Sequence, residues 1–201
     1  MTVPDPVVVV RRRLLGGGLS AVLLTTCTAS HAVADDGLWD ALQQGGLVIL
    51  LRHAMTTPGV GDPPGFKLGD CRTQRNLTDQ GRAQAARLGE ALRAHRVPVE
   101  RVLSSPWCRC IETARLAFNG TPETSPALAN LFGRPESREQ LAELRKLLAD
   151  FRARGNLVLV SHGSTIVAVT GVAPEPAEMV IVTPEGGGRF SVRGRLSTHQ
   201  A

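Results

Sequence analysis

Five consecutive apolar residues, Leu47-Val48-Ile49-Leu50-Leu51, lead directly into Arg52-His53-Ala54. Such a run is typical of a strand buried on both faces, as in a parallel sheet. A second run of this kind covers residues 156–160 and leads into Ser161-His162-Gly163. A shorter strand is expected over residues 101–104, with Val102-Leu103 as its core, and it leads into Ser105 and Pro106. The sequence therefore predicts three strands, two of them buried on both faces, and each leads into a loop that begins a motif.

Helical patterns alternate with these strands. They predict helices over residues 38–44, from Thr78 as N-cap to 94, from Pro106 to 118, from Ser137 to 154 and over 164–170. A terminal hairpin is expected over residues 179–183 and 190–192, around three glycines. This order predicts an α/β three-layer sandwich with a mostly parallel central sheet flanked by helices. Residues 55–76 show no periodicity and form a long loop, a kind of segment that is usually functional.

Cationic and imidazole groups follow all three predicted strands. Arg52 and His53 follow the first, Arg109 lies shortly after the second, and His162 follows the third. In open α/β sheets ligands bind beyond the carboxyl ends of the strands, so these side chains are expected around one crevice. Guanidinium groups match phosphate oxygens, and a neutral imidazole can attack phosphorus to form a covalent intermediate. The combination indicates phosphoryl transfer.

Four ordered motifs carry a resemblance to a known family. They are residues 50–56 (Leu-Leu-Arg-His-Ala-Met-Thr), 76–85 (Asn-Leu-Thr-Asp-Gln-Gly-Arg-Ala-Gln-Ala), 104–114 (Ser-Ser-Pro-Trp-Cys-Arg-Cys-Ile-Glu-Thr-Ala) and 160–163 (Val-Ser-His-Gly). Together they resemble the signature of the histidine phosphatase superfamily, which has the phosphoglycerate mutase-like fold. The resemblance spans roughly residues 46–183.

The resemblance implies a role for each matching residue. His53 would be the phosphorylated nucleophile, with Arg52, Arg109 and His162 around the phosphoryl group and a hydroxyl contact from Thr56. It implies a phosphatase that uses no cofactor and no metal. Two arginines of the long loop, Arg72 and Arg75, are further candidates for binding an anionic substrate.

One position departs from the family pattern. Many members carry a glutamate that protonates the leaving group, and the corresponding position here is Asn130, which has no proton to give. General acid catalysis contributes about 10²–10⁴-fold in rate, so the loss matters for a poor leaving group.

Three explanations stay open. Another acid replaces the glutamate, the candidate proton donors being Asp62, Glu136 and Glu178. Alternatively, the substrate has a better leaving group, such as a phosphohistidine or an anhydride. In the third explanation the protein is a non-catalytic binder of a phosphorylated ligand.

Residues 1–34 have the pattern of a signal peptide. Three arginines at 11–13 precede a short apolar run, and Ala32-Val33-Ala34 forms a cleavage site that leaves a domain of residues 35–201. The apolar run is too short to span a bilayer. Lipid attachment at Cys27 is the alternative to simple cleavage. A periplasmic or secreted location follows, and an envelope sugar phosphate is then a candidate substrate.

Charge and composition narrow the range of partners. Without residues 1–34, which hold three arginines and one aspartate, the net charge falls from +5 to +3, too small an excess to indicate nucleic acid. Only 3% of residues are aromatic and none is tyrosine, which argues against stacking platforms for single strands. A small phosphorylated substrate remains the expected partner.

Three cysteines remain after the leader. One disulfide from Cys71 to Cys108 or Cys110 is favoured in an oxidising compartment, and three separate thiols are the alternative. Their spacing is poor for a metal site.

Overall fold

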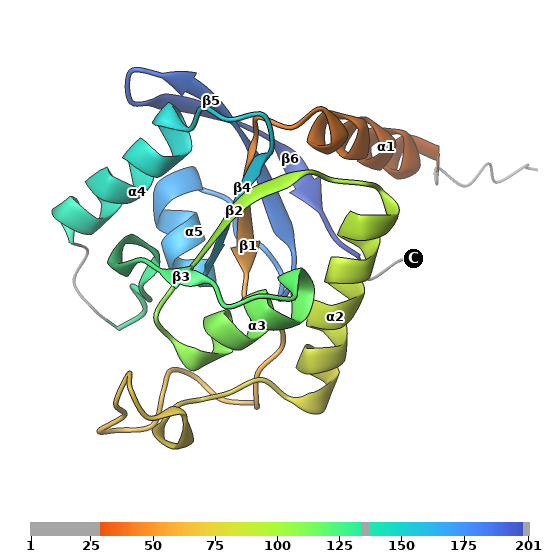
Figure 1. Ribbon diagram of the computed structural model, residues 1–201. Coiled ribbons are helices and arrows are strands. Elements are labelled where there is room, and N and C mark those ends of the chain that lie inside the picture. Colours follow the sequence, from red (N-terminus) through yellow and green to blue (C-terminus); the bar gives the residue numbers. More distant parts are fainter. Residues whose placement is uncertain (1–28, 134–136, 199–201) are drawn as a thin grey trace, which may run out of the picture.

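The computed structural model describes residues 29–133 and 137–198, which form one central sheet between two layers of helices (Figure 1). The strands of the sheet are β1 (Val48–Arg52), β2 (Val99–Ser104), β3 (Glu123–Thr124), β4 (Asn156–Ser161), β5 (Met179–Gly186) and β6 (Arg189–Leu196). Their order is β3-β2-β4-β1-β5-β6. The first four in that order run parallel, and β5 and β6 are antiparallel additions at one side. The predicted fold class is confirmed.

Five α-helices and two short 3₁₀ turns complete the part of the chain that the structure describes. They are α1 (Ala29–Gln44), η1 (Cys71–Thr73), α2 (Asp79–Ala94), α3 (Cys108–Phe118), η2 (Pro126–Leu128), α4 (Arg138–Asp150) and α5 (Gly163–Thr170).

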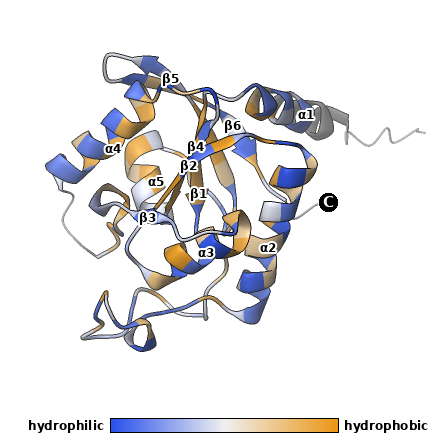
Figure 2. Ribbon diagram, in the orientation of Figure 1, coloured by the Kyte–Doolittle hydropathy of each residue, from blue (hydrophilic) through white to orange (hydrophobic). Residues whose placement is uncertain are grey.

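Alternate residues of the central strands feed two separate cores. Ile49 and Leu51 of β1 pack with α1, α2 and α3, while Val48 and Leu50 pack with α4 and α5. Figure 2 shows the resulting pattern, with apolar strands in the middle and polar residues on the outer sides of the helices. Because both faces of β1 and β4 are covered, their sequences are apolar at nearly every position.

Helix α2 begins and ends close to where the sequence predicts. Thr78 is its N-cap, and the Thr78 hydroxyl accepts a hydrogen bond of 3.0 Å from the backbone N–H of Gly81. Ser137 caps α4 in the same way, by accepting from the N–H of Gln140. Serine followed three residues later by glutamine also predicts a capping box, but the Gln140 side chain does not complete it, because its amide donates to the carbonyl of Ala129.

Three predicted helix ends are wrong. Helix α3 begins at Cys108 with Trp107 as its N-cap, so Pro106 lies before the helix rather than in its first turn. Helix α4 ends at Asp150 rather than 154, because Phe151 already has an extended backbone and its side chain packs against the core between the sheet and helices α4 and α5. Helix α1 starts at Ala29, well before residue 38. The terminal strands β5 and β6 are also longer than the predicted hairpin.

The long loop between β1 and α2 is tied to α3 by a disulfide. Cys71 in η1 is bonded to Cys108 at the start of α3, with 5.7 Å between the two Cα atoms. This confirms the favoured interpretation of the cysteines and fixes the pairing. Cys110 is free and buried, and burial raises the pKa of its thiol to about 12, so it stays protonated.

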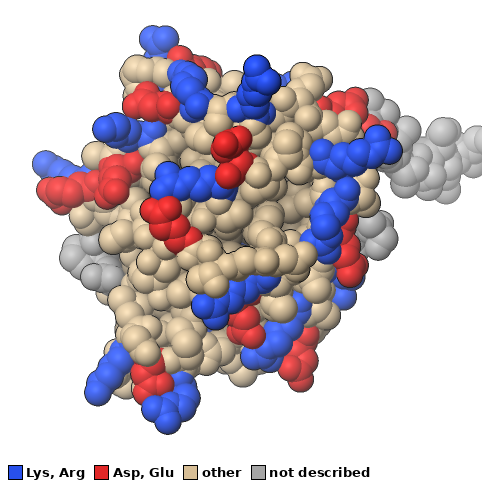
Figure 3. Space-filling model, viewed as in Figure 1, with Lys and Arg blue, Asp and Glu red and all other residues tan. Residues whose placement is uncertain are grey.

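The proposed leader lies mostly outside the described residues. Residues 1–28, with Cys27, are not described, and residues 29–34 form the first part of α1. Among the helices that are described, none combines the length and the apolar character that a bilayer span requires. Figure 3 shows basic and acidic side chains interleaved over one face of the molecule, in keeping with the small net charge.

Candidate active site

The carboxyl ends of β1, β2 and β4 open into a cleft of about 340 Å³. Three arginines (Arg52, Arg75, Arg109) and two histidines (His53, His162) line it. Backbone contacts bring the two histidine segments together, since the N–H of His53 donates to the carbonyl of Ser161 at 3.0 Å. The groups that the sequence places after separate strands therefore meet at one edge of the sheet, as expected.

His53 is buried and held in one tautomer. Its Nδ1 lies 2.9 Å from the carbonyl oxygen of Ala54, which can only accept, so Nδ1 carries the proton. Burial lowers the pKa of His53 to about 3, with the charges of Arg109 and Arg52 acting in the same direction. The ring is thus neutral near pH 7, and its Nε2 has a free lone pair.

His162 is held by contacts at both ring nitrogens. Nδ1 lies 3.4 Å from Nη2 of Arg109, which can only donate, so Nδ1 accepts. Nε2 then carries the proton and donates to the hydroxyl of Ser105 at 2.8 Å. The rings of His53 and His162 meet edge to face with centroids 5.4 Å apart. Burial lowers the pKa of His162 well below its ordinary value, so both imidazoles are neutral.

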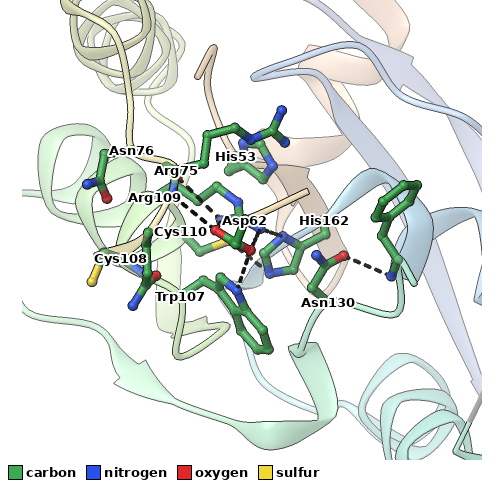
Figure 4. Close-up of polar contacts among 12 residues, drawn as sticks. His53, Asp62, Arg75, Asn76, Trp107, Cys108, Arg109, Cys110, Asn130 and His162 are labelled. Carbon is green, nitrogen blue, oxygen red and sulfur yellow. Dashed lines mark hydrogen bonds and ion pairs between the residues drawn. The ribbon is translucent and has the colours of Figure 1, made fainter. Parts of the chain in front are cut away.

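Arg109 forms a buried ion pair with Asp62 of the long loop, drawn in Figure 4. Its Nη1 and Nη2 lie 2.7 and 3.2 Å from the two carboxylate oxygens, and the side chains are only 1% and 3% exposed. Trp107 Nε1 and the N–H of Arg75 also donate to this carboxylate. Burial by itself would raise the pKa of Asp62, but these hydrogen bonds outweigh it and the pKa is lowered. Asp62 is therefore an ionised acceptor that orients Arg109, which argues against its candidacy as proton donor.

Arg52 and Arg75 complete a cationic lining. Arg52 donates through Nη1 to the carbonyl of Pro174 at 2.7 Å, and Arg75 donates through Nη1 to the carbonyl of Gly59. Desolvation lowers the pKa of both guanidinium groups. Within residues 29–133 and 137–198, the buried Nε atoms of these two arginines and of Arg109 have no hydrogen-bond partner. Unused donors beside a cationic cleft suit an anion that presents several oxygens.

Asn130 lies in the cleft with its amide in a fixed orientation. Its Oδ1 accepts from the backbone N–H of Phe132 at 3.1 Å and from the hydroxyl of Ser164 at 2.9 Å. Since a backbone N–H can only donate, Oδ1 and Nδ2 are unambiguous, and Figure 4 shows Nδ2 on the side of His162. The cleft therefore has a hydrogen-bond donor, and no acid, at the position where the resemblance places a glutamate.

The family model of the histidine phosphatase superfamily, branch 1, matches residues 48–154, just over half of the chain. The chain belongs to the histidine phosphatase superfamily. Comparison with curated proteins gave no match.

Solved structures of similar fold agree with this assignment. The phosphoserine phosphatase of Entamoeba histolytica in complex with 3-phosphoglyceric acid has a TM-score of 0.56 and 15% identity, over 76% of this chain and 98% of that one. The protein histidine phosphatase SixA complexed with tungstate has a TM-score of 0.54 and 19% identity, over 75% and 96%. The product of an open reading frame of Mycobacterium tuberculosis has a TM-score of 0.55 and 23% identity, over 73% of this chain and 94% of that one. At these identities the likeness shows the shared fold.

Several residues of the superfamily motifs stabilise the backbone that carries the cleft residues. Gln84 accepts from the N–H of Met55 at 2.9 Å, and Thr113 accepts from the N–H of Ala54 at 3.1 Å and donates to the carbonyl of Arg109. A Cβ at Gly81 would collide with the carbonyl of Met55, so α2 passes this segment only with glycine there. These residues fix the backbone just after His53.

The structure separates the two arginine candidates of the long loop. Arg75 lines the cleft, whereas Arg72 is 90% exposed, is paired with Asp70 and is not among the lining residues. Thr56 lies in an isolated bridge with Leu77 and is not among the lining residues.

Of the two glutamate candidates for proton donor, only Glu178 lies among the described residues. Glu178 is buried behind Arg52, where it pairs with Arg195 at 2.9 Å and accepts from the N–H of Glu175. It does not line the cleft. Glu136 lies outside the described residues. Among those described, no group of three or more His, Cys, Asp or Glu side chains is placed to hold a metal ion.

The sequence did not indicate two kinds of contributor to the cleft. Ser105 holds His162, and its place inside the Ser-Ser-Pro motif was a usable signal. Val60, Phe132 and Val167 line the outer part of the cleft, and nothing in their sequence surroundings distinguishes them from other apolar residues of loops and helices.

Proposed function

We propose that the protein is an exported phosphatase that hydrolyses phosphate monoesters through a phosphohistidine intermediate on His53. The observation that carries the proposal is the tautomer of His53, whose proton is held at Nδ1 by the carbonyl of Ala54. Its Nε2 lone pair therefore lies free in a cleft lined by three arginines.

The chemistry proceeds in two displacements. In the first, Nε2 of His53 forms a bond to phosphorus, the ester P–O bond breaks, and the leaving oxygen takes a proton from water. In the second, a water oxygen bonds to phosphorus, the N–P bond breaks, and phosphate leaves while the water proton goes to solvent. Arg52, Arg75 and Arg109 neutralise the phosphoryl oxygens in both steps. His162 donates to an oxygen once the added negative charge favours its protonated form.

The disulfide supports the export part of the proposal. Structural disulfides persist in oxidising compartments and are rare in the cytoplasm of mesophiles, and Cys71–Cys108 is such a bond. Together with the signal-peptide pattern of residues 1–34, it favours a periplasmic or secreted location. Cleavage after Ala34 and lipid attachment at Cys27 both agree with such a location.

A direct test is the hydrolysis of 4-nitrophenyl phosphate by the full chain in the presence of a chelator. We expect turnover by the wild type and a loss of about four orders of magnitude or more for His53→Ala, because the nucleophile is gone. His95→Ala is the matched control, since this histidine stacks on Trp39 away from the cleft and its loss should leave the rate unchanged. Turnover retained by His53→Ala would show that the mechanism is wrong.

A second candidate function follows from Asn130. Without a proton donor, a phosphoramidate such as phosphohistidine, or an acyl phosphate, is hydrolysed more readily than an alkyl ester. Asn130→Glu tests this point, because it restores a carboxyl group at a cleft position already in contact with Ser164. We expect the variant to raise kcat on an alkyl phosphate by about 10-fold or more relative to kcat on acetyl phosphate. No change in that ratio would mean that another group supplies the proton.

The non-catalytic alternative is separated by the same assays. A correctly folded wild type that hydrolyses neither 4-nitrophenyl phosphate nor acetyl phosphate, but binds inorganic phosphate in calorimetry, would be a binder rather than an enzyme.

A further inference from the structure

The outer part of the cleft is lined by exposed apolar side chains. Six large hydrophobic residues are exposed in the part of the chain that the structure describes, and three of them line this one cleft. These three are Val60, Phe132 and Val167, which are 83%, 54% and 41% exposed, and we call them the cleft mouth. Exposed apolar side chains that gather at one place, and are not scattered singly, indicate a surface that contacts an apolar group.

The mouth is built from three separate segments that face one another across the cleft. Phe132 is held by the bond from its N–H to Asn130, and the loop at Gly61 passes its ring closely enough that a Cβ there would lie 3.7 Å from a ring carbon. Val167 lies one turn after Gly163 on the same face of α5, and Gly163 lies beside Arg52, since a Cβ at Gly163 would be 3.4 Å from Nε of that arginine. The aromatic ring and the valine are therefore fixed by elements that also form the phosphate end.

The polar groups available at the mouth are few. All the charged residues of the lining are arginines, and no carboxylate is among the described lining residues. The hydroxyl of Ser164 already donates to Asn130, which leaves Nδ2 of Asn130 as a donor. A sugar presents hydroxyl groups on every side and needs many partners to replace its water. A flat apolar group needs only the contact area that Phe132 and its neighbours offer.

We propose that this cleft selects phosphate monoesters of aromatic alcohols, with the phosphate among the arginines and the ring against the cleft mouth. This inference rests on the proposed phosphatase function and names its substrate class. It replaces the expectation of an envelope sugar phosphate.

The chemistry of the leaving group points to the same class. When the P–O bond to the ring breaks, the electron pair goes to a phenolate, which is far less basic than an alkoxide and is protonated by water afterwards. Nδ2 of Asn130 can donate a hydrogen bond to that oxygen, although it cannot transfer a proton. An aryl ester is therefore a substrate that tolerates the absence of the glutamate.

The test compares three esters with the full chain: phenyl phosphate, 2-naphthyl phosphate and glucose 6-phosphate. Phenol and 2-naphthol are leaving groups of similar basicity, so any preference between the first two reports apolar contact rather than chemistry. We expect KM to be about 5- to 10-fold lower for 2-naphthyl than for phenyl phosphate, and glucose 6-phosphate to be the poorest substrate. Phe132→Ala should remove most of the naphthyl preference through KM, with Val167→Ser reducing it less.

Val192→Ser is the matched control, because Val192 is a similarly exposed valine on β6, outside the cleft. It should leave the ratio of the two KM values unchanged. Equal KM values for phenyl and naphthyl phosphate, an equal effect of Phe132→Ala on both, or a preference for glucose 6-phosphate would each overturn the inference. If no ester is hydrolysed, the phosphatase proposal fails and binding decides the inference. Tighter binding of 2-naphthyl phosphate than of inorganic phosphate would then support it, and equal or weaker binding would overturn it.

Discussion

The floor and the mouth of the cleft are built in opposite ways. The floor, formed by His53, Arg109 and His162, is almost completely buried, and each of its side chains is fixed by hydrogen bonds. The mouth is exposed, apolar and carried by loops and one helix face. The floor follows strand ends and matches the motifs of the superfamily, whereas the residues of the mouth lie outside the motifs. The comparison indicates that the reaction is set by the sheet and the choice of substrate by the loops.

The largest expected effect is the loss of stability when the buried ion pair of the floor is broken. Arg109→Ala leaves the carboxylate of Asp62 buried without its cation, so we expect the free energy of unfolding to fall by about 3–5 kcal/mol. Urea denaturation followed by circular dichroism measures the change. Arg72→Ala is the comparison, since its exposed pair with Asp70 should give no measurable loss. Similar small losses for both variants would mean that the floor is not held by this pair.

The disulfide joins floor and mouth, because it ties the loop between β1 and α2, which carries both Asp62 and Val60, to the start of α3. The bond links residues 37 positions apart, and its loss should cost about 2–4 kcal/mol. Dithiothreitol should therefore lower the urea midpoint of the wild type. The double variant Cys71→Ser, Cys108→Ser should begin at the lower midpoint and be insensitive to the reductant. A wild type that dithiothreitol leaves unchanged, under conditions where thiol titration shows the bond reduced, would contradict this role.

The smallest expected effect is the change in the free energy of unfolding with pH, which arises from the histidines of the floor. His53 has a pKa of about 3 when folded and an ordinary value of 6.5, so below pH 6.5 the unfolded chain binds a proton that the folded protein does not. Stability is therefore fully present above pH 6.5 and is lost as the pH falls toward 3, by at most about 1.4 kcal/mol per pH unit through this imidazole. His162 acts in the same direction. Urea midpoints at pH 7, 6 and 5 measure the slope, which should be shallower in His53→Asn. Equal slopes would show that other groups dominate.

Much of the floor could be predicted because its information is local. A buried strand followed by Arg52 and His53, and another followed by His162, place these groups at one sheet edge through topology alone. Thr78 likewise fixes the start of α2 by a cap that acts over three residues. The pairing of Cys71 with Cys108 rather than Cys110 needed the structure, because two residues of α3 differ in which way they face.

The mouth could not be predicted from the sequence, and neither could the residues that hold the floor side chains in place. Both depend on contacts between segments that are distant in the sequence. Asp62 meets Arg109 across 47 positions, from a loop with no periodic pattern. Phe132 lies near Gly61 because two irregular loops, far apart in the sequence, pack side by side. The early end of α4 has a similar cause, since the extended Phe151 reaches into the core where a helical continuation would be expected.

Helix α1 has a consequence for what cleavage of the proposed leader would leave in place. The contacts that dock it, Leu38 and Leu42 in the core and Trp39 stacked on His95 with ring centroids 4.0 Å apart, all follow residue 34. Cleavage of the proposed leader would remove six of its sixteen residues and none of these anchors. The helix then enters β1 at the amino edge of the sheet, as Figure 1 shows. The residues that line the cleft lie at the carboxyl edge. A chain cleaved after Ala34 would therefore keep the contacts by which α1 packs on the sheet, and the cleft at the opposite edge would keep its lining.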